Sequence, residues 1–153
     1  MRSTINLYNE DCLLAMQKMV DNQYDLAIVD PPYGLFKNGK EFGYKINTFN
    51  KMKEAEKWDE PPNKEYFTEL FRISKNQIIW GMQYFVEFLP SFSTLIIWDK
   101  GTGKSVRADG ESAFCSIKGT LRIWKHLWSG AFKWSEHGIK RIHPTQKPVA
   151  LYK

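Results

Sequence analysis

The residues best suited to chemistry in this chain are the tetrad Asp30-Pro31-Pro32-Tyr33. The tetrad directly follows a short apolar run, residues 26–29, which predicts a strand, and ligands of open α/β sheets bind where strands end. Its two prolines fix the local backbone and remove two N–H donors, which leaves carbonyl oxygens free to accept hydrogen bonds. The corner offers a carboxylate, a main-chain carbonyl and a phenol ring, a set that suits an amino group on a flat heterocycle.

The simplest alternative for an Asp-Pro-Pro sequence is a stiff turn with a solvated carboxylate. The context favours the functional interpretation, because the tetrad follows a strand-like run, precedes Gly34 and opens a long basic segment at residues 35–57. We therefore expect Asp30 to lie at a binding corner of the fold.

The elements that must position this corner alternate between short apolar runs and helical patterns, which predicts an α/β fold. No internal repeat or linker divides the chain, so residues 1–153 are predicted to form a single domain. Asp99 directly follows the strand predicted at residues 94–98, just as Asp30 directly follows the strand predicted at residues 24–29. Strands are predicted at residues 5–8, 24–29, 77–80 and 94–98, with a later, antiparallel one at 112–117.

Three helices are predicted from apolar spacing and from capping residues. Asp11 can cap the first, in which apolar residues recur at helical spacing up to Val20. Pro61-Pro62 are predicted to start the second, consistent with proline in a first turn. The third is predicted at residues 82–89, ended by Pro90.

Several motifs together resemble the exocyclic-amino DNA methyltransferases, which modify the 6-amino group of adenine or the 4-amino group of cytosine. The family signature is Asp/Asn/Ser-Pro-Pro-Tyr/Phe, which residues 30–33 match. Residues 9–12 (NEDC), 97–100 (IWDK) and 143–148 (HPTQKP) also agree, in the order of the permuted branch called the beta class. The resemblance spans nearly all of the chain. It implies a Rossmann-like methyltransferase fold, S-adenosylmethionine as cofactor and double-stranded DNA as partner, as in restriction-modification systems.

The resemblance implies a catalytic role for each member of the tetrad Asp30, Pro31, Pro32 and Tyr33. If Asp30 and the Pro31 carbonyl each accept one N–H, the amine nitrogen is drawn toward tetrahedral geometry and can attack a methyl group directly. Asp30 would orient the amine and stabilise charge rather than act as a strong base. Tyr33 would stack on a base flipped out of the duplex.

The resemblance also assigns cofactor-binding residues near the N-terminus. Asp11 matches the acidic residue that holds the adenine end of the cofactor, with Cys12 beside it. A helix cap and a small buried thiol are the alternative roles, and a cap can coexist with cofactor binding.

Near the other end, residues 143–148 match the stretch before the family's cofactor-binding glycine motif. This match implies that Thr145 and Lys147, together with Asp30, lie close to the cofactor. By itself the segment would pass for an ordinary turn, because His-Pro and Lys-Pro steps disfavour helix. In the family the glycine-rich loop follows about one helix later, whereas the sequence stops at Lys153. We therefore expect this chain to bind the cofactor weakly or not at all.

A basic segment at residues 35–57 is predicted to be a mobile loop that contacts the DNA backbone. The alternative is a solvated charged face, the usual role of such runs. A net charge of +5 and a pI near 9.1 agree with an acidic partner. The lysines assigned to DNA are Lys37, Lys40, Lys45, Lys51 and Lys53.

The composition excludes several other classes of protein. A chain of 153 residues with 42% hydrophobic residues fits one compact domain or most of one, not a disordered tail. Neither Cys12 nor Cys115 follows a proline, which excludes the carbon-5 cytosine mechanism. The cysteines and the three histidines have no metal spacing, so no metal site is predicted. Without a run of signal-peptide or membrane length, we expect a cytoplasmic protein with no membrane partner.

Three hypotheses stay open from the sequence. The first is an active DNA methyltransferase, for which Asp at the head of the tetrad favours adenine. The second is an inactive, truncated relative that binds DNA as a module. The third is a half-enzyme completed by homodimerisation or by a second polypeptide.

Overall fold

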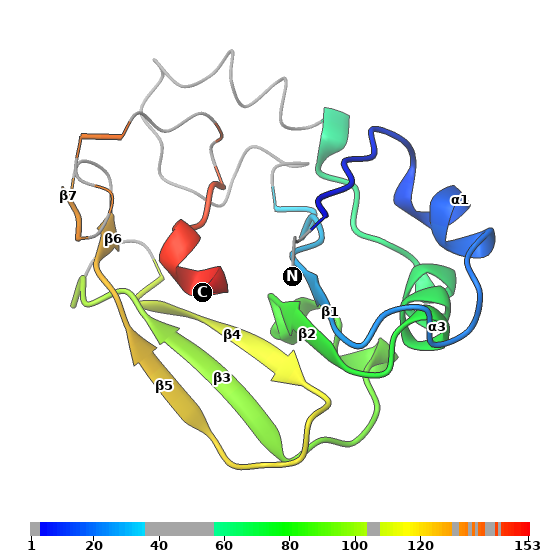
Figure 1. Cartoon of the computed structure of the whole chain (residues 1–153). Helices are drawn as coiled ribbons and strands as arrows, with labels where there is room; N and C mark the ends of the chain where they lie inside the picture. Colours follow the sequence, from blue (N-terminus) through cyan, green and yellow to red (C-terminus); the bar gives the residue numbers. More distant parts are fainter. Residues whose placement is uncertain are drawn as a thin grey trace.

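The structure, a computed structural model, describes residues 4–35, 57–103, 108–129, 132–134, 136, 138–139, 143 and 145–153. Its centre is a mixed sheet of five strands in the order β1-β2-β4-β3-β5 (Figure 1). The strands are β1 (Ala27–Val29), β2 (Gln77–Trp80), β3 (Thr94–Asp99), β4 (Gly110–Cys115) and β5 (Arg122–Lys125). The described residues thus form a mixed α/β structure that is compatible with a Rossmann-like fold.

The strand directions bring several strand ends to one edge of the sheet. β1 pairs in parallel with β2, and β3 pairs in parallel with β5. β4 lies antiparallel between β2 and β3, with Ala113 opposite Trp80 and Glu111 opposite Trp98. Therefore one edge of the sheet, where the parallel strands end, holds the carboxyl ends of β1, β2, β3 and β5 and the first residues of β4. Asp30 lies at this edge.

Two helices pack against each other beside the β1 end of the sheet (Figure 1). Helix α1 (Cys12–Gln17) is capped by Asp11, whose Oδ1 accepts the Leu14 N–H at 3.0 Å. Helix α3 (Lys64–Ile73) is capped by Asn63. The Arg72 guanidinium donates to carbonyl oxygens at the end of α1 and just beyond it, which ties the two helices together.

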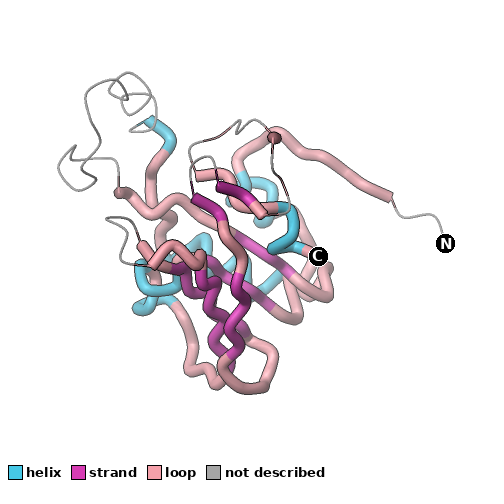
Figure 2. Tube along the Cα trace, turned by 90° about the vertical axis from the view of Figure 1, so that its left-hand side faces the viewer, coloured by secondary structure: helices cyan, strands magenta, loops and turns pink. Residues whose placement is uncertain are grey.

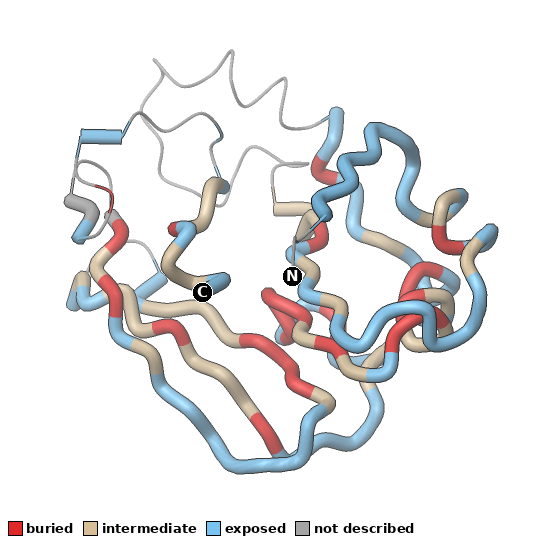
Figure 3. The backbone as a smooth tube through the Cα atoms, in the orientation of Figure 1, coloured by how far each residue is buried: buried red, intermediate tan, exposed pale blue. Residues whose placement is uncertain are grey.

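The buried residues lie mainly on α3 and the central strands (Figure 3), and their side chains form two clusters. The larger cluster joins the apolar face of α3 to β2 and β4 through Phe67, Leu70, Ile79 and Phe114, among others. The smaller cluster is rich in tryptophan and includes Trp80, Trp98, Ala113 and Trp128. In contrast, the edge strand β5 is mostly exposed.

Short elements complete the described fold. Two 3₁₀ turns, η2 (Met82–Tyr84) and η3 (Val86–Phe88), follow β2, and η4 (Val149–Tyr152) lies at the C-terminal end. A small sheet pairs β6 (Trp128–Ser129) with β7 (Phe132–Lys133). No helix among the described residues is long and apolar enough to cross a membrane.

The central strands agree well with the sequence. The strand predicted at residues 77–80 is confirmed, and the one predicted at 94–98 continues to Asp99. The antiparallel strand predicted at 112–117 is present as β4, displaced by two residues toward the N-terminus. β5 was not predicted, because its residues do not form an apolar run.

Two strand predictions need correction. Residues 5–8 form no strand; they extend away from the sheet (Figure 2), and the side chains of Ile5 and Leu7 are 83% and 92% exposed. No strand of the described residues pairs with them, so their apolar character alone does not make a strand. The strand predicted at 24–29 is shorter, because Tyr24 forms only an isolated bridge before β1 begins.

Among the helices, the cap at Asp11 is confirmed. Pro61-Pro62 do not start the second helix, because the side chain of Asn63 makes the cap and α3 begins after it. The prediction of one continuous helix over residues 82–89 is wrong. Phe85 has a φ of −127°, far from helical values, because its side chain turns into the core and splits the segment into two 3₁₀ turns.

Replacing Trp98 tests the tryptophan-rich cluster. Its ring is 1% exposed, and Nε1 donates to the His126 carbonyl at 2.9 Å. Trp98→Phe removes this donor and part of the packed volume, so we expect the free energy of unfolding to fall by about 2 kcal/mol. The same change at Trp134, which is 58% exposed, should cost less than about 0.5 kcal/mol. Urea denaturation measures both; equal losses would contradict the assigned core.

Candidate active site

Asp30 lies directly after β1, at the edge of the sheet where the parallel strands end. Its side chain is 28% exposed. The Tyr33 hydroxyl donates to Oδ1 at 2.6 Å, and the Lys147 ammonium contacts Oδ2 at 3.0 Å. Each carboxylate oxygen can accept two hydrogen bonds, so each retains capacity for a ligand N–H.

Lys147 connects Asp30 to a second acidic residue. Its ammonium donates to Glu111 Oε2 at 2.6 Å, and Lys100 contacts Glu111 Oε1 at 2.6 Å. The result is an alternating ion chain, Asp30–Lys147–Glu111–Lys100, in which two carboxylates balance two ammonium groups. It joins the end of β1, the C-terminal segment, the start of β4 and the residue after β3.

The ion chain determines the charge state of Glu111. Burial alone would raise its pKa, but the ammonium groups of Lys147 and Lys100 outweigh burial and hold the pKa of Glu111 below its ordinary value of 4.5. Tyr152 on η4 also faces this region. Burial, followed by the negative charges of Asp30 and Glu111, raises the pKa of Tyr152 to about 12.

Tyr33 acts as a neutral hydrogen-bond donor in this site. Burial, followed by the charge of Asp30 and their hydrogen bond, raises the pKa of Tyr33 far above its ordinary value. Its ring stacks on Tyr84 at a centroid distance of 4.8 Å and meets Phe85 edge-on at 6.0 Å. One face of the Tyr33 ring is therefore covered by Tyr84 rather than open to a ligand.

Gly81 provides the space that the Tyr33 ring occupies. It follows β2 with a φ of +68°, and a Cβ at this position would overlap the Tyr33 ring. A side chain here would also be strained in the left-handed region. The position of the Tyr33 hydroxyl, and through it that of Asp30, thus depends on a glycine at residue 81.

The prolines of the tetrad are packed into the fold. Pro31 is buried, and Pro32 is half-buried. Gly34, the residue after the tetrad, has a φ of +74° and donates its N–H to Asp59 Oδ1 at 3.0 Å. Asp59 is 2% exposed, so the turn is anchored to a buried side chain.

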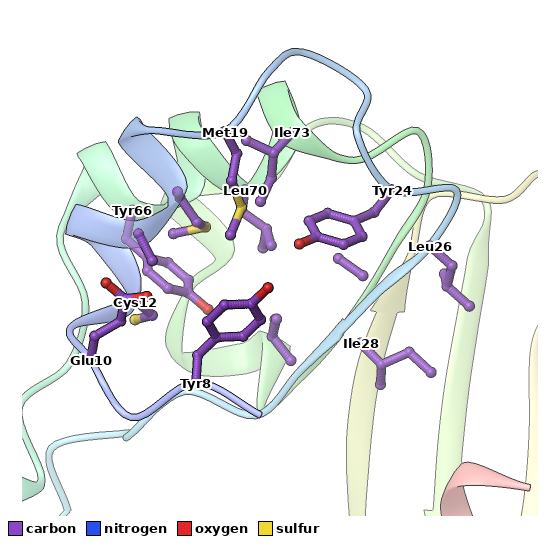
Figure 4. A pocket seen from close by; sticks show the side chains of 14 residues that line it. Tyr8, Glu10, Cys12, Met19, Tyr24, Leu26, Ile28, Tyr66, Leu70 and Ile73 are labelled. Carbon is purple, nitrogen blue, oxygen red and sulfur yellow. The ribbon is translucent and has the colours of Figure 1, made fainter. Parts of the chain in front are cut away.

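A groove of about 370 Å³ runs between β1 and the two helices (Figure 4). Its lining is mainly apolar and aromatic, and Glu10 is the one charged residue among the described residues that line it. The groove reaches Val29, the neighbour of Asp30. Because β1 is an edge strand, its residue Ile28 and the preceding Leu26 remain 41% and 42% exposed.

The structure brings together part of the predicted site. Asp30, Tyr33 and Lys147 are in contact, and the exposed Cys12 lines the groove that reaches Val29. Asp11 caps α1 and is not among the residues that line the groove.

Two other groups of predicted residues lie apart from this cluster. Thr145 is exposed and contacts His143 Nδ1 within a turn. The five lysines predicted to bind DNA fall outside the described residues; they are Lys37, Lys40, Lys45, Lys51 and Lys53.

Sequence reasoning missed Glu111, Lys100, Gly81 and Tyr84. Lys100 had a usable signal, because it follows the end of a predicted strand just as Asp30 does. Glu111 had none, since its partners lie 11 and 36 residues away in the chain. Among the described residues, no group of three or more His, Cys, Asp or Glu side chains could hold a metal ion.

Compared with known proteins, the chain matches no family model and no curated protein. The methyltransferase resemblance therefore rests on the short sequence motifs.

Replacing Gly81 with alanine tests the support of Tyr33. Gly81→Ala should lower the free energy of unfolding by about 3 kcal/mol, because left-handed strain adds to the overlap with the ring. Gly138 is the matched control, with a φ of +81° and nothing within 4 Å among the described residues. Gly138→Ala should lower the free energy of unfolding by only about 1 kcal/mol, because only the left-handed backbone strain applies there. Equal losses in urea denaturation would show that Gly81 does not support the ring.

Replacing Glu111 with glutamine tests the ion chain through pH. Because the folded-state pKa of Glu111 lies below its ordinary 4.5, its charge stabilises the fold above that pH, and this stabilisation is lost as pH falls through the folded value. Glu111→Gln should be less stable than the wild type at neutral pH, and the difference should shrink well below pH 4.5. Urea denaturation at both pH values measures it, with the exposed Glu87→Gln as control. A difference independent of pH would contradict the assignment.

Proposed function

We propose that this chain carries the catalytic corner of a DNA methyltransferase that acts on an exocyclic amino group, adenine N6 being favoured. The observation that carries the proposal is the position of the Asp30 carboxylate. It lies at the carboxyl end of β1, is held by the Tyr33 hydroxyl and the Lys147 ammonium, and retains acceptor capacity. A partly exposed, fixed carboxylate within Asp-Pro-Pro-Tyr suits an amine that must be oriented before it reacts.

In the proposed mechanism Asp30 accepts one N–H of the target amine and the Pro31 carbonyl accepts the other. These two contacts draw the nitrogen lone pair out of conjugation with the ring, so that it can act as a nucleophile. When bound, S-adenosylmethionine would supply the methyl group: the methyl carbon–sulfur bond of its sulfonium would break as the carbon–nitrogen bond forms, with neutral S-adenosylhomocysteine as the leaving group. Asp30 stabilises the positive charge that develops on the amine, and the surplus proton leaves to water.

The aromatic residues near Asp30 provide the surface for a flipped base. Tyr33 is already stacked on Tyr84, and Tyr84 is 43% exposed. The pair presents an aromatic platform toward solvent, on which a base can recover part of the stacking that it loses on leaving the duplex. In this form of the proposal Tyr84 shares the stacking role that the family signature gives to Tyr33.

The groove beside β1 fits the adenosine end of S-adenosylmethionine. The side chains of Tyr8, Tyr24 and Tyr66 surround it (Figure 4), and the Glu10 carboxylate can accept from ribose hydroxyls. Its end at Val29 adjoins Asp30. The described lining holds no cation for the carboxylate of the methionine end, so this part of the cofactor needs further groups.

In the described part of the chain no strand pairs with the outer edge of β1, which favours a second arrangement, in which another polypeptide or a second copy of the chain completes the site. Parallel strands are normally buried on both sides, yet Leu26 and Ile28 are about two-fifths exposed beside the groove. A completing element along this edge would cover these side chains and supply the missing cofactor contacts.

Transfer of a labelled methyl group to DNA tests the proposed function. With S-adenosylmethionine in large excess, we expect the wild-type chain to label duplex DNA and Asp30→Ala to lower the rate by at least about 10³-fold, because the orienting acceptor is lost. Asp25→Asn is the control, since Asp25 is exposed and pairs with Lys75 away from the site.

Equal rates for the wild type and Asp30→Ala would refute the mechanism. A rate that rises more steeply than the first power of chain concentration would favour completion by a second copy. DNA binding without any labelling would favour the inactive binding module.

A further inference from the structure

Lys147 has a buried ammonium group whose surroundings point to a specific task. Its side chain is 6% exposed, and Nζ lies 2.6 Å from Glu111 Oε2, 3.0 Å from Asp30 Oδ2 and 3.5 Å from the Tyr33 hydroxyl. A DNA phosphate cannot reach a lysine buried to this degree without displacing these partners. Its charge is therefore directed at the site and not at solvent.

The backbone on both sides of Lys147 is anchored. The Gln146 carbonyl accepts the indole N–H of Trp128 at 2.9 Å, and the Val149 N–H donates to Glu136. Trp128 is itself buried, at 4% exposure. Because main chain and ammonium are both held, Lys147 presents its charge at a fixed position.

Aromatic rings close the remaining space around the ammonium. Nζ lies 5.8 Å from the Tyr33 ring centroid and 5.9 Å from that of Trp80, within the range of cation–π attraction. Glu111 contacts the same ammonium at 2.6 Å, and Lys100 balances the charge of Glu111. The ion chain thus sets how closely the ammonium approaches Asp30.

We propose that Lys147 is a positioning residue, which with Tyr33 clamps the Asp30 carboxylate in the orientation that receives the target amine; this inference rests on the proposed methyltransferase function. Tyr33 holds Oδ1 and Lys147 holds Oδ2, so the carboxylate cannot rotate about its Cβ–Cγ bond without breaking a contact. Each oxygen keeps one accepting position. Glu111 supports the clamp by holding Lys147.

Methyl-transfer kinetics test the clamp. Lys147→Met should lower kcat by about a hundredfold and leave the KM for DNA within about twofold, because the amine is misplaced after it binds. Lys75→Met is the matched control, since Lys75 pairs with Asp25 on the surface, and its kinetics should equal those of the wild type. An unchanged kcat in Lys147→Met, or a higher KM with kcat intact, would overturn the proposal.

Lysine side-chain NMR tests the same contact in a chain that retains Lys147. A buried, hydrogen-bonded ammonium gives a slowly exchanging signal, so we expect a distinct Lys147 ammonium resonance. Asp30→Asn should shift or broaden it, whereas Asp25→Asn, which changes an exposed ion pair away from the site, should leave it unchanged. A Lys147 signal identical in Asp30→Asn and the wild type would overturn the clamp. Since this readout needs no activity, it decides the clamp even where the wild type transfers no methyl group and the proposed function fails.

Discussion

The contact on which the site depends most is that of the Lys147 ammonium with the carboxylates of Asp30 and Glu111. A buried charge is stable only when opposite charges and hydrogen bonds compensate it, and here two carboxylates do so at 3.0 and 2.6 Å. This requirement brings the C-terminal segment to the sheet edge where β1 ends and β4 begins. The geometry of Asp30 is therefore a property of the tertiary fold and not of the tetrad alone.

The sequence predicted those parts of the fold that local patterns determine. The apolar runs of β2 and β3 pack into the core, and Asp11 caps α1 through a contact three residues away. Residues 5–8 show the limit of such patterns, because an apolar run becomes a strand only where a neighbour pairs with it.

The same limit explains which parts of the site were predicted. Asp30 and Tyr33 were found because they lie three positions apart in the chain and one motif contains both. Their contacts with Lys147 span more than a hundred residues, and no spacing rule predicts them. Glu111 and Gly81 act through partners distant in sequence, so only the folded chain reveals their roles.

The catalytic corner and the groove beside β1 divide the proposed chemistry between them. In the proposed function the corner would orient an amine through Asp30, whereas the groove would offer tyrosine rings and Glu10 to an adenosine group next to Val29. Both depend on β1, whose end carries the carboxylate and whose residues line the groove. A substrate amine and a methyl donor would thus meet at the end of one short strand.

In the proposed function the Asp30 corner receives the exocyclic amino group of a DNA base. Mass spectrometry of nucleosides, from DNA of cells that lack other DNA methyltransferases and express this chain, tests the claim most directly. We expect a base methylated on its exocyclic nitrogen, with N6-methyladenine favoured over N4-methylcytosine. DNA with no such base, or with a methyl group on a ring carbon instead, would contradict it.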